Sequence, residues 1–313
     1  MTETLLLKLN KQQEEIIKAV LYFDVFNYPL TLEELYENSA ISLSWTDFQQ
    51  ALKDLIDQGC LKTEGDFVLS AEADIATIDR RLKANNKALE VMPLAYRYSQ
   101  KIASYPFVEG VCISGSLSKN YFDENSDLDF FIITKPNRLW ICRTLLILRY
   151  KTLSKEKKKW WCTNYFIASD NLGIPDKNAF TGTELAYLFP TVNHQVYTRL
   201  LEHNAWYKNR FPNKHAASPK VSLPIRQPFY KTILESLFVS RFGDWIDNLL
   251  LGFTLRHWQK KYPDMAETDF ELQFRSRKNV CKRHTKGFQN KILTLWEQKQ
   301  KHFETKFNTL FQS

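Results

Sequence analysis

The sequence predicts an α/β protein of the α+β type, in which a small mixed sheet is flanked by helical segments on both sides. Capped helical patterns fill the first part of the chain, short apolar strands with polar turns fill the middle, and helical patterns return from Val192 onward. A chain of 313 residues with 44% hydrophobic residues is long enough for two or three packed units. We therefore expect a winged-helix-like domain at 1–70 (the N-terminal unit), connecting helices at 71–104, a mixed-sheet domain at 105–215 and a basic helical region at 225–313.

The N-terminal unit has the pattern of three short helices followed by a hairpin. The first helix spans 12–23, where apolar residues recur at helical spacing. Thr31 with Glu34 forms a capping-box pattern for the second helix, and Ser44 with Asp47 forms a similar start for the third. An alternating stretch then turns at a Glu-Gly pair, as a small two-stranded wing would. Three helices and a wing are the order of a winged helix-turn-helix.

The charge of the N-terminal unit argues against DNA binding, the obvious function of that fold. The unit contains five Lys and no Arg against twelve Asp and Glu, a net charge of −7, whereas the whole chain carries +8. The third helix, which would enter the groove, carries Asp47, Asp54 and Asp57 against Lys53 alone. We therefore expect no duplex DNA binding here and favour a protein-docking or packing module. The charge contrast predicts separate units with separate partners.

The segments after the N-terminal unit and at the end of the chain are expected to be helical. Residues 71–104 are rich in Ala, Leu, Lys and Arg and lack Gly, which predicts one or two helices that Pro93 starts, kinks or breaks.

Near the end, a cationic run without acids predicts either a site for a phosphate-rich ligand such as nucleic acid or a solvated helix face. This cationic run consists of Arg275, Arg277, Lys278, Lys282, Arg283 and Lys286.

The clearest chemical signal lies in residues 107–134, FVEGVCISGSLSKNYFDENSDLDFFIIT. An apolar strand is expected to lead into the small-residue turn at Gly115 and Ser116, and Leu117 to Phe122 is expected to begin a helix. Asp127 and Asp129 then stand two residues apart at the head of a second strand. Residues i and i+2 of a strand point to the same face, so the two carboxylates are expected to converge.

Converging carboxylates repel one another unless a cation lies between them. Mg²⁺ typically takes one or two carboxylates together with substrate phosphates. Gly115 lets the backbone come close to a phosphate, while Ser116 and free amides at a helix start can donate to its oxygens. A polar hairpin edge is the alternative interpretation, but it does not explain the Gly-Ser turn.

The pattern Gly-Ser, ten residues, Asp-x-Asp resembles the signature of the polymerase beta-type nucleotidyltransferases, especially their minimal and antibiotic-modifying members. The phrase YFDVFNYPLTLEEL also resembles the opening of winged-helix segments that precede such domains in bacterial proteins. The resemblance implies that Gly115 and Ser116 hold the terminal phosphates of a nucleoside triphosphate. It also implies that Asp127 and Asp129 bind two Mg²⁺ ions. We add Lys119, which could neutralise phosphate charge, and Ser126 to the nucleotide-binding residues.

The sequence departs from that family at the third carboxylate, which lies on a later strand and activates the attacking hydroxyl. The best matching strand, WCTNYFIA, has Asn164 at its centre, and an amide can coordinate or orient but cannot act as a general base. Asp170 or Glu184 could substitute, but neither is in register. Two hypotheses remain open. One is a nucleotidyltransferase in which Asp127, Asp129 and Asn164 are catalytic and the acceptor is unknown. The other is a non-catalytic, nucleotide-sensing regulator.

The remaining composition indicates a reducing compartment and no membrane partner. Five cysteines without a CxxC pair fit reduced thiols better than a disulfide framework or a zinc site. No apolar stretch is long enough to span a bilayer. The N-terminal sequence has no basic leader or small-residue cleavage site, so we expect no secretory signal and a cytoplasmic protein.

Overall fold

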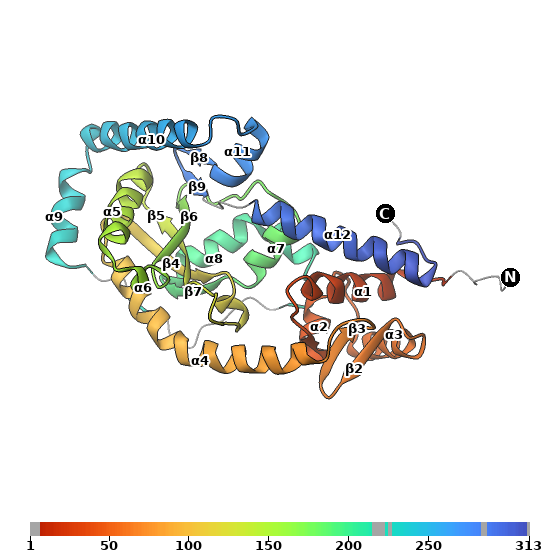
Figure 1. Cartoon of the computed structure of the whole chain (residues 1–313). Coiled ribbons are helices and arrows are strands. Elements are labelled where there is room, and N and C mark those ends of the chain that lie inside the picture. The colour runs from red at the N-terminus through yellow and green to blue at the C-terminus, as the bar shows by residue number, and fades with distance from the viewer. Residues whose placement is uncertain (1–6, 215–222, 225–226, 283–286, 312–313) are drawn as a thin grey trace.

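A computed structural model describes residues 7–214, 223–224, 227–282 and 287–311. Within these ranges, the central feature is a six-stranded mixed sheet with the order β7-β4-β5-β6-β9-β8 (Figure 1). Neighbouring strands are antiparallel except β5 and β6, which are parallel. The mixed sheet expected from the sequence is therefore present. Its strands are β4 (Val108–Ser114), β5 (Asp129–Thr134), β6 (Cys162–Ala168), β7 (Phe189–Val192), β8 (Ser276–Arg277) and β9 (Val280–Lys282).

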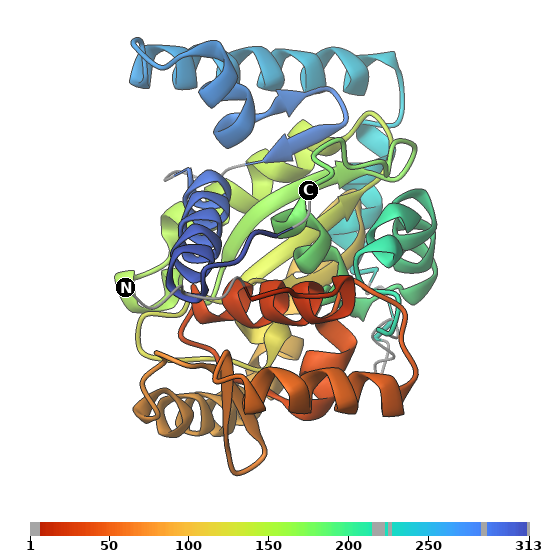
Figure 2. The same ribbon diagram turned by 90° about the vertical axis from the view of Figure 1, so that its right-hand side faces the viewer.

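Alternate residues of the central strands face two different helical layers. On β5, Phe130 and Ile132 are buried in one hydrophobic cluster, and Phe131 and Ile133 are buried in another. The first cluster includes residues of the long helix α4 and of α5, and the second includes residues of α7 and α8, so helices cover both faces of the sheet (Figure 2). Strands buried on both faces are apolar throughout, which is the pattern of FFII here. The helices concerned are α4 (Ala76–Ala103), α5 (Leu139–Thr152), α7 (Ala179–Ala186) and α8 (His194–His203). A short helix, α6 (Lys155–Lys158), precedes β6.

The N-terminal unit contains the three helices and the hairpin that the sequence predicts. Both hydrogen bonds of the capping box between Thr31 and Glu34 are formed. The Ser44 side chain accepts a hydrogen bond from the Asp47 amide. Gly65 turns the hairpin with φ +55°, and a further short strand joins it in a three-stranded sheet of order β1-β3-β2. The elements are α1 (Lys11–Asp24), β1 (Leu30–Thr31), α2 (Leu32–Asn38), α3 (Trp45–Asp57), β2 (Leu61–Glu64) and β3 (Phe67–Ser70).

One helix connects the N-terminal unit to the central sheet. Helix α4 runs without interruption for 28 residues, although Pro93 lies inside it. Of the outcomes expected for residues 71–104, a single connecting helix is therefore the one observed. Its C-terminal half packs on the sheet through Val91, Ala95 and Ile102.

The end of the chain differs from the helical region that we expected. Four helices are present, but residues of the cationic run form β8 and β9, and β9 pairs with β6 in the central sheet. The expected helices are therefore present, but the two short strands were not expected. Pairing with β9 satisfies the backbone groups along one edge of β6, which would otherwise be open. The helices are α9 (Phe229–Leu237), α10 (Arg241–Lys261), α11 (Glu267–Phe274) and α12 (Phe288–Phe307).

Helix α12 packs directly on the N-terminal unit (Figure 1). The Trp296 indole N–H donates to the Lys18 carbonyl at 3.0 Å, and its ring meets the Tyr22 ring edge-on at 5.5 Å. The Lys299 ammonium lies 2.7 Å from the Asp24 carboxylate. Part of the acidic charge of the N-terminal unit is therefore met by the basic end of the same chain.

None of the described helices combines the length and the apolar character that crossing a bilayer requires.

Candidate functional site

The Gly-Ser turn follows β4 and packs against the carboxylate at the start of β5. Ser114 pairs with Asp129 across the two antiparallel strands. Gly115 has φ +68°, a conformation that side chains disfavour, and a Cβ atom there would collide with the Asp129 carboxylate. Glycine is therefore required at this position for two reasons, the backbone conformation and the close approach.

The turn continues as a single 3-10 turn, η1 (Leu117–Lys119), and not as the helix expected from Leu117 to Phe122. Asn120 adopts the left-handed conformation with φ +55° and ends the turn, while Phe122 is buried and stacks on Trp160. The prediction of a helix here is wrong because tertiary packing directs the chain away after one turn. A helix dipole therefore adds nothing to anion binding, which depends on the groups of Gly115, Ser116 and Lys119.

The two predicted carboxylates meet at one pocket but not on one strand. Asp129 is the first residue of β5 and is half-buried, whereas Asp127 precedes the strand and is exposed. The expectation that both begin the same strand therefore fails for Asp127, while Leu128 between them is buried and its amide donates to the Lys159 carbonyl at 2.7 Å. Both aspartates nevertheless line the same open pocket of about 500 Å³, together with Gly115, Ser116, Ser126 and Asn164.

Asn164 lies beside Asp129 on the neighbouring parallel strand. Its side-chain amide donates to Asp129 Oδ1 at 2.7 Å, and its Oδ1 accepts from the Cys162 thiol at 3.2 Å. The residue therefore orients the Asp129 carboxylate. Among the described residues, no group of three or more His, Cys, Asp or Glu side chains is arranged to hold a metal ion.

The electrostatics of Asp129 indicate a site that lacks positive charge. The pKa of Asp129 is raised to about 7, mainly by burial and in addition by the negative charges of Glu184 and Asp127, while a hydrogen bond with Cys162 and the charge of Lys119 oppose the shift. A cation at the pocket would relieve this repulsion. Oxygen ligands in a pocket with room for phosphates are the donor set that Mg²⁺ takes.

Sequence reasoning missed the position of Glu184, which we had considered only as a replacement for the third carboxylate. From helix α7, Glu184 Oε1 lies 2.7 Å from the Lys119 ammonium, and Oε2 accepts from the Gly115 amide at 3.4 Å. One carboxylate thus engages two of the donors predicted for phosphate. No sequence signal could place it there, since the residues are 65 and 69 positions apart.

A second, smaller cavity of about 170 Å³ lies on the other side of Asp129. It shares Gly115, Asp129 and Asn164 with the open pocket. Phe131 and Tyr165 stack with ring centroids 4.7 Å apart in its wall, and the buried Tyr165 hydroxyl has no hydrogen-bond partner among the described residues. Asp129 therefore lines both the open pocket and a mostly apolar cavity, whereas Asp127 lines only the open pocket.

The cationic run is neutralised by acids from other parts of the chain. Asp176 pairs with Arg275 at 2.9 Å and with Lys282 at 3.2 Å. Arg277 pairs with Glu271, and Lys278 pairs with Asp247. These four residues therefore do not form an unpaired basic surface. Arg283 and Lys286 of the cationic run lie outside the described residues.

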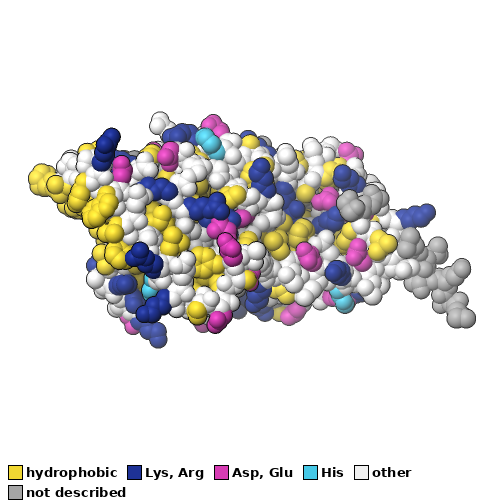
Figure 3. Space-filling model, turned by 90° about the horizontal axis from the view of Figure 1, so that it is seen from above, with side chains coloured by type: hydrophobic (Ala, Val, Ile, Leu, Met, Phe, Trp, Pro, Cys, Tyr) yellow, Lys and Arg dark blue, Asp and Glu magenta, His cyan; other side chains and the backbone are white. Residues whose placement is uncertain are grey.

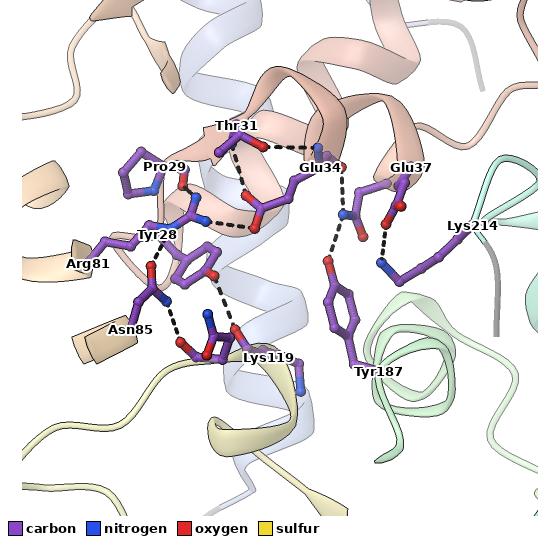
Figure 4. A network of polar contacts seen from close by, with 12 residues as sticks. Tyr28, Pro29, Thr31, Glu34, Glu37, Arg81, Asn85, Lys119, Tyr187 and Lys214 are labelled. Atoms are coloured by element: carbon purple, nitrogen blue, oxygen red, sulfur yellow. Dashed lines mark hydrogen bonds and ion pairs between the residues drawn. The ribbon is translucent and has the colours of Figure 1, made fainter. Parts of the chain in front are cut away.

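The N-terminal unit touches the turn that carries Lys119 (Figure 4). The Tyr28 hydroxyl donates to the Lys119 carbonyl at 3.1 Å, and the Asn85 side chain donates to the Asn120 carbonyl. Arg81 lies over the Tyr28 ring at 4.2 Å and pairs with Glu34 at 2.6 Å. The N-terminal unit therefore supports the back of the Gly-Ser turn.

A second set of contacts joins the N-terminal unit to helix α7. The Asn38 amide donates to the Tyr187 hydroxyl at 2.7 Å, and Lys214 pairs with Glu37 at 2.8 Å (Figure 4). Tyr187 follows directly after the helix that carries Glu184. Besides helix α12, the N-terminal unit thus contacts the turn that carries Lys119 and the end of the helix that carries Glu184.

Comparisons with protein-family models, curated proteins and solved structures returned no match to this chain.

Proposed function

We propose that this chain is a Mg²⁺-dependent nucleotidyltransferase that moves a nucleotidyl group from a nucleoside triphosphate to an acceptor hydroxyl or a similar group. One observation carries the proposal. The turn at Gly115 approaches the Asp129 carboxylate so closely that only glycine fits, and both face the open pocket that Asp127 and Ser116 also line. A phosphate chain in this pocket would meet backbone and hydroxyl donors on one side and carboxylates on the other.

In this proposal Asp127 and Asp129 would hold the Mg²⁺ ions. The metal supplies charge neutralisation for the triphosphate and for the leaving pyrophosphate. The residues fit this role because both offer carboxylate oxygens, and because the raised pKa of Asp129, which comes mainly from burial and in part from neighbouring carboxylates, marks a charged form that a cation would stabilise.

The other residues of the pocket would bind and orient the nucleotide. The Gly115 amide and the Ser116 hydroxyl would donate to terminal phosphate oxygens, and the Lys119 ammonium would offset phosphate charge. Asn164 would hold the Asp129 carboxylate in place through the 2.7 Å hydrogen bond. Ser126 hydrogen-bonds to Asp123 at 2.7 Å and would position the loop in front of Asp127.

A second candidate function is nucleotide sensing without transfer. The observation that favours it is Asn164, whose side chain on β6 hydrogen-bonds to Asp129 and cannot accept a proton from an acceptor hydroxyl. The N-terminal unit, which touches the Gly-Ser turn through Tyr28, would then transmit nucleotide occupancy to a partner.

Calorimetry with non-hydrolysable triphosphates, with and without Mg²⁺, tests both candidates. We expect Asp127→Asn and Asp129→Asn each to weaken metal-dependent binding steeply, while Asp170→Asn, an exposed carboxylate outside the pocket, serves as the matched control. Pyrophosphate release with the four natural triphosphates and a panel of hydroxyl acceptors then separates transfer from sensing. Binding that ignores Mg²⁺ and both substitutions would refute the site itself.

A further inference from the structure

Helices α9 and α10 present a continuous apolar surface to solvent. Phe229 and Val239 are 81% and 74% exposed, and Trp245 and Phe253 are 58% and 55% exposed. Figure 3, which views the molecule from above, shows hydrophobic side chains gathered over the end of the molecule where α9 and α10 lie. Monomeric proteins seldom leave so many large apolar side chains together in water, so the surface marks an interaction site. We call it the α9–α10 surface; its large apolar members are Phe229, Ile233, Leu237, Val239, Phe242, Trp245, Leu249 and Phe253.

The exposed side chains follow one stripe along helix α10. Their positions are separated by three or four residues, so they lie on one side of the helix. The stripe ends in two exposed cations, Arg256 and Lys260, which form no ion pair with any described residue. The members in order are Phe242, Trp245, Leu249, Phe253, Arg256 and Lys260.

The acidic residues of these two helices do not belong to the surface, because each pairs with a cation of the body of the protein. Glu235 pairs with Lys135 at 2.7 Å, and Asp244 pairs with Arg138. Asp247 is fully buried, accepts from the amides of Trp140 and Ile141, and pairs with Lys278. The outward side of α9 and α10 is therefore apolar and cationic.

This charge distribution indicates whether a second copy of the chain or a different partner covers the α9–α10 surface. Two copies packed through the stripe in antiparallel fashion would place Arg256 and Lys260 near Arg241, and a parallel arrangement would place them against themselves. Like charges would meet in both cases without an acidic partner, which opposes self-association. The complementary occupant is an apolar layer with an anionic border.

We propose that the α9–α10 surface binds peripherally to an anionic phospholipid bilayer. Phe and Trp side chains on one side of a helix enter the boundary between headgroups and acyl chains, while long cationic side chains remain at the anionic headgroups. Helices α9 and α10 lie at the outer edge of the fold (Figure 1). Peripheral binding departs from the expectation of no membrane partner, because that expectation considered only membrane-spanning segments. The proposal does not depend on nucleotidyl transfer.

Sedimentation of the full chain with vesicles tests the proposal. We expect binding to an equal mixture of phosphatidylcholine and phosphatidylglycerol, and much less binding to phosphatidylcholine alone. The double substitutions Trp245→Ser with Phe253→Ser and Arg256→Glu with Lys260→Glu should each weaken partitioning by at least about tenfold. Matched controls on other helices are Leu89→Ser, and Lys291→Glu with Lys301→Glu, all exposed; they should leave binding unchanged.

Two results would overturn the proposal. One is an absence of binding to the anionic vesicles at low salt by folded wild-type chain. The other is a dimer in light scattering that becomes a monomer on substitution of Trp245 and Phe253, which would assign the surface to a second copy. Since all substituted side chains are exposed, circular dichroism should confirm that every variant folds.

Discussion

The Lys119 ammonium lies 2.7 Å from Glu184 Oε1, and the other oxygen of the same carboxylate accepts from the Gly115 amide. Glu184 thus occupies donors that the proposed function assigns to a triphosphate. A nucleotide must either displace this carboxylate or bind beside it, and both cost free energy through like-charge repulsion.

We therefore expect Glu184→Gln to strengthen triphosphate binding. The substitution removes one negative charge next to the phosphate donors while keeping the side-chain shape, and the gain should be about 1–2 kcal/mol, or roughly 5- to 30-fold in Kd. Calorimetry with a non-hydrolysable triphosphate measures it. Glu202→Gln, an exposed glutamate on α8, is the control. Weaker binding by Glu184→Gln would instead show that Glu184 helps to hold the metal or the nucleotide.

The raised pKa of Asp129 predicts an unusual pH dependence of stability in chelator. Because the folded state holds this proton up to about pH 7, whereas the model value is 3.8, the unfolded state releases it first as the pH rises. Asp129 therefore lowers the free energy of unfolding progressively between about pH 4 and 7, and Asp129→Asn should be more stable than wild type by about 1–3 kcal/mol at pH 8.

Denaturant titration at pH 4 and pH 8 in chelator checks this expectation. The stability gain of Asp129→Asn should shrink toward pH 4, where both side chains are neutral, and Asp170→Asn should show no comparable gain. At pH 8, Mg²⁺ should make wild type more stable than Asp129→Asn, because it binds the folded wild-type protein. If Asp129→Asn destabilises the chain equally at both pH values, the carboxylate is stabilised by contacts and not strained by repulsion.

Asn164→Asp should make the fold depend on Mg²⁺. The substitution replaces the 2.7 Å hydrogen bond to Asp129 with two carboxylates in contact, which should lower stability in chelator by about 2 kcal/mol. Added Mg²⁺ should restore stability and, if transfer occurs, raise its rate by supplying a base. Asn164→Ala provides the contrast, because it loses the hydrogen bond without gaining a ligand. Rescue of both variants by Mg²⁺ would exclude a role for the new carboxylate.

Helix α3 should make no phosphate contact with duplex DNA. Lys53 is its single cation beside Asp47, Asp54 and Asp57. Whatever DNA the intact, net positive chain binds, Lys53→Glu should change neither the affinity nor its salt dependence. Fluorescence anisotropy across a salt series measures both. A phosphate contact at Lys53 would be revealed by a salt slope that falls by about one.

Much of the local structure could be predicted because its causes lie within a few residues. Ser44 caps the helix that Asp47 begins, and Gly115 allows the turn that follows β4. The expected helix after Ser116 failed for a tertiary reason, since Phe122 packs on Trp160 and the chain leaves after one turn. The candidate site shows the same division between local and tertiary causes. The predicted Asp pair lines the pocket, whereas the sequence did not predict that Glu184 lies beside it.

By itself, the sequence determined the capped helices, the hairpin, the apolar strands and the Gly-Ser turn, since short-range hydrogen bonds and side-chain periodicity produce them. Only the tertiary structure decided which charged side chains form ion pairs and which do not. Asp176 neutralises Arg275 and Lys282 from 99 and 106 positions away, because β9 pairs beside β6 and brings the cationic run to that acid. The same order of strands and helices leaves Arg256 and Lys260 without an ion pair to any of the described residues. Pairing between distant charges depends on how the sheet and its helices assemble, which a linear pattern does not contain.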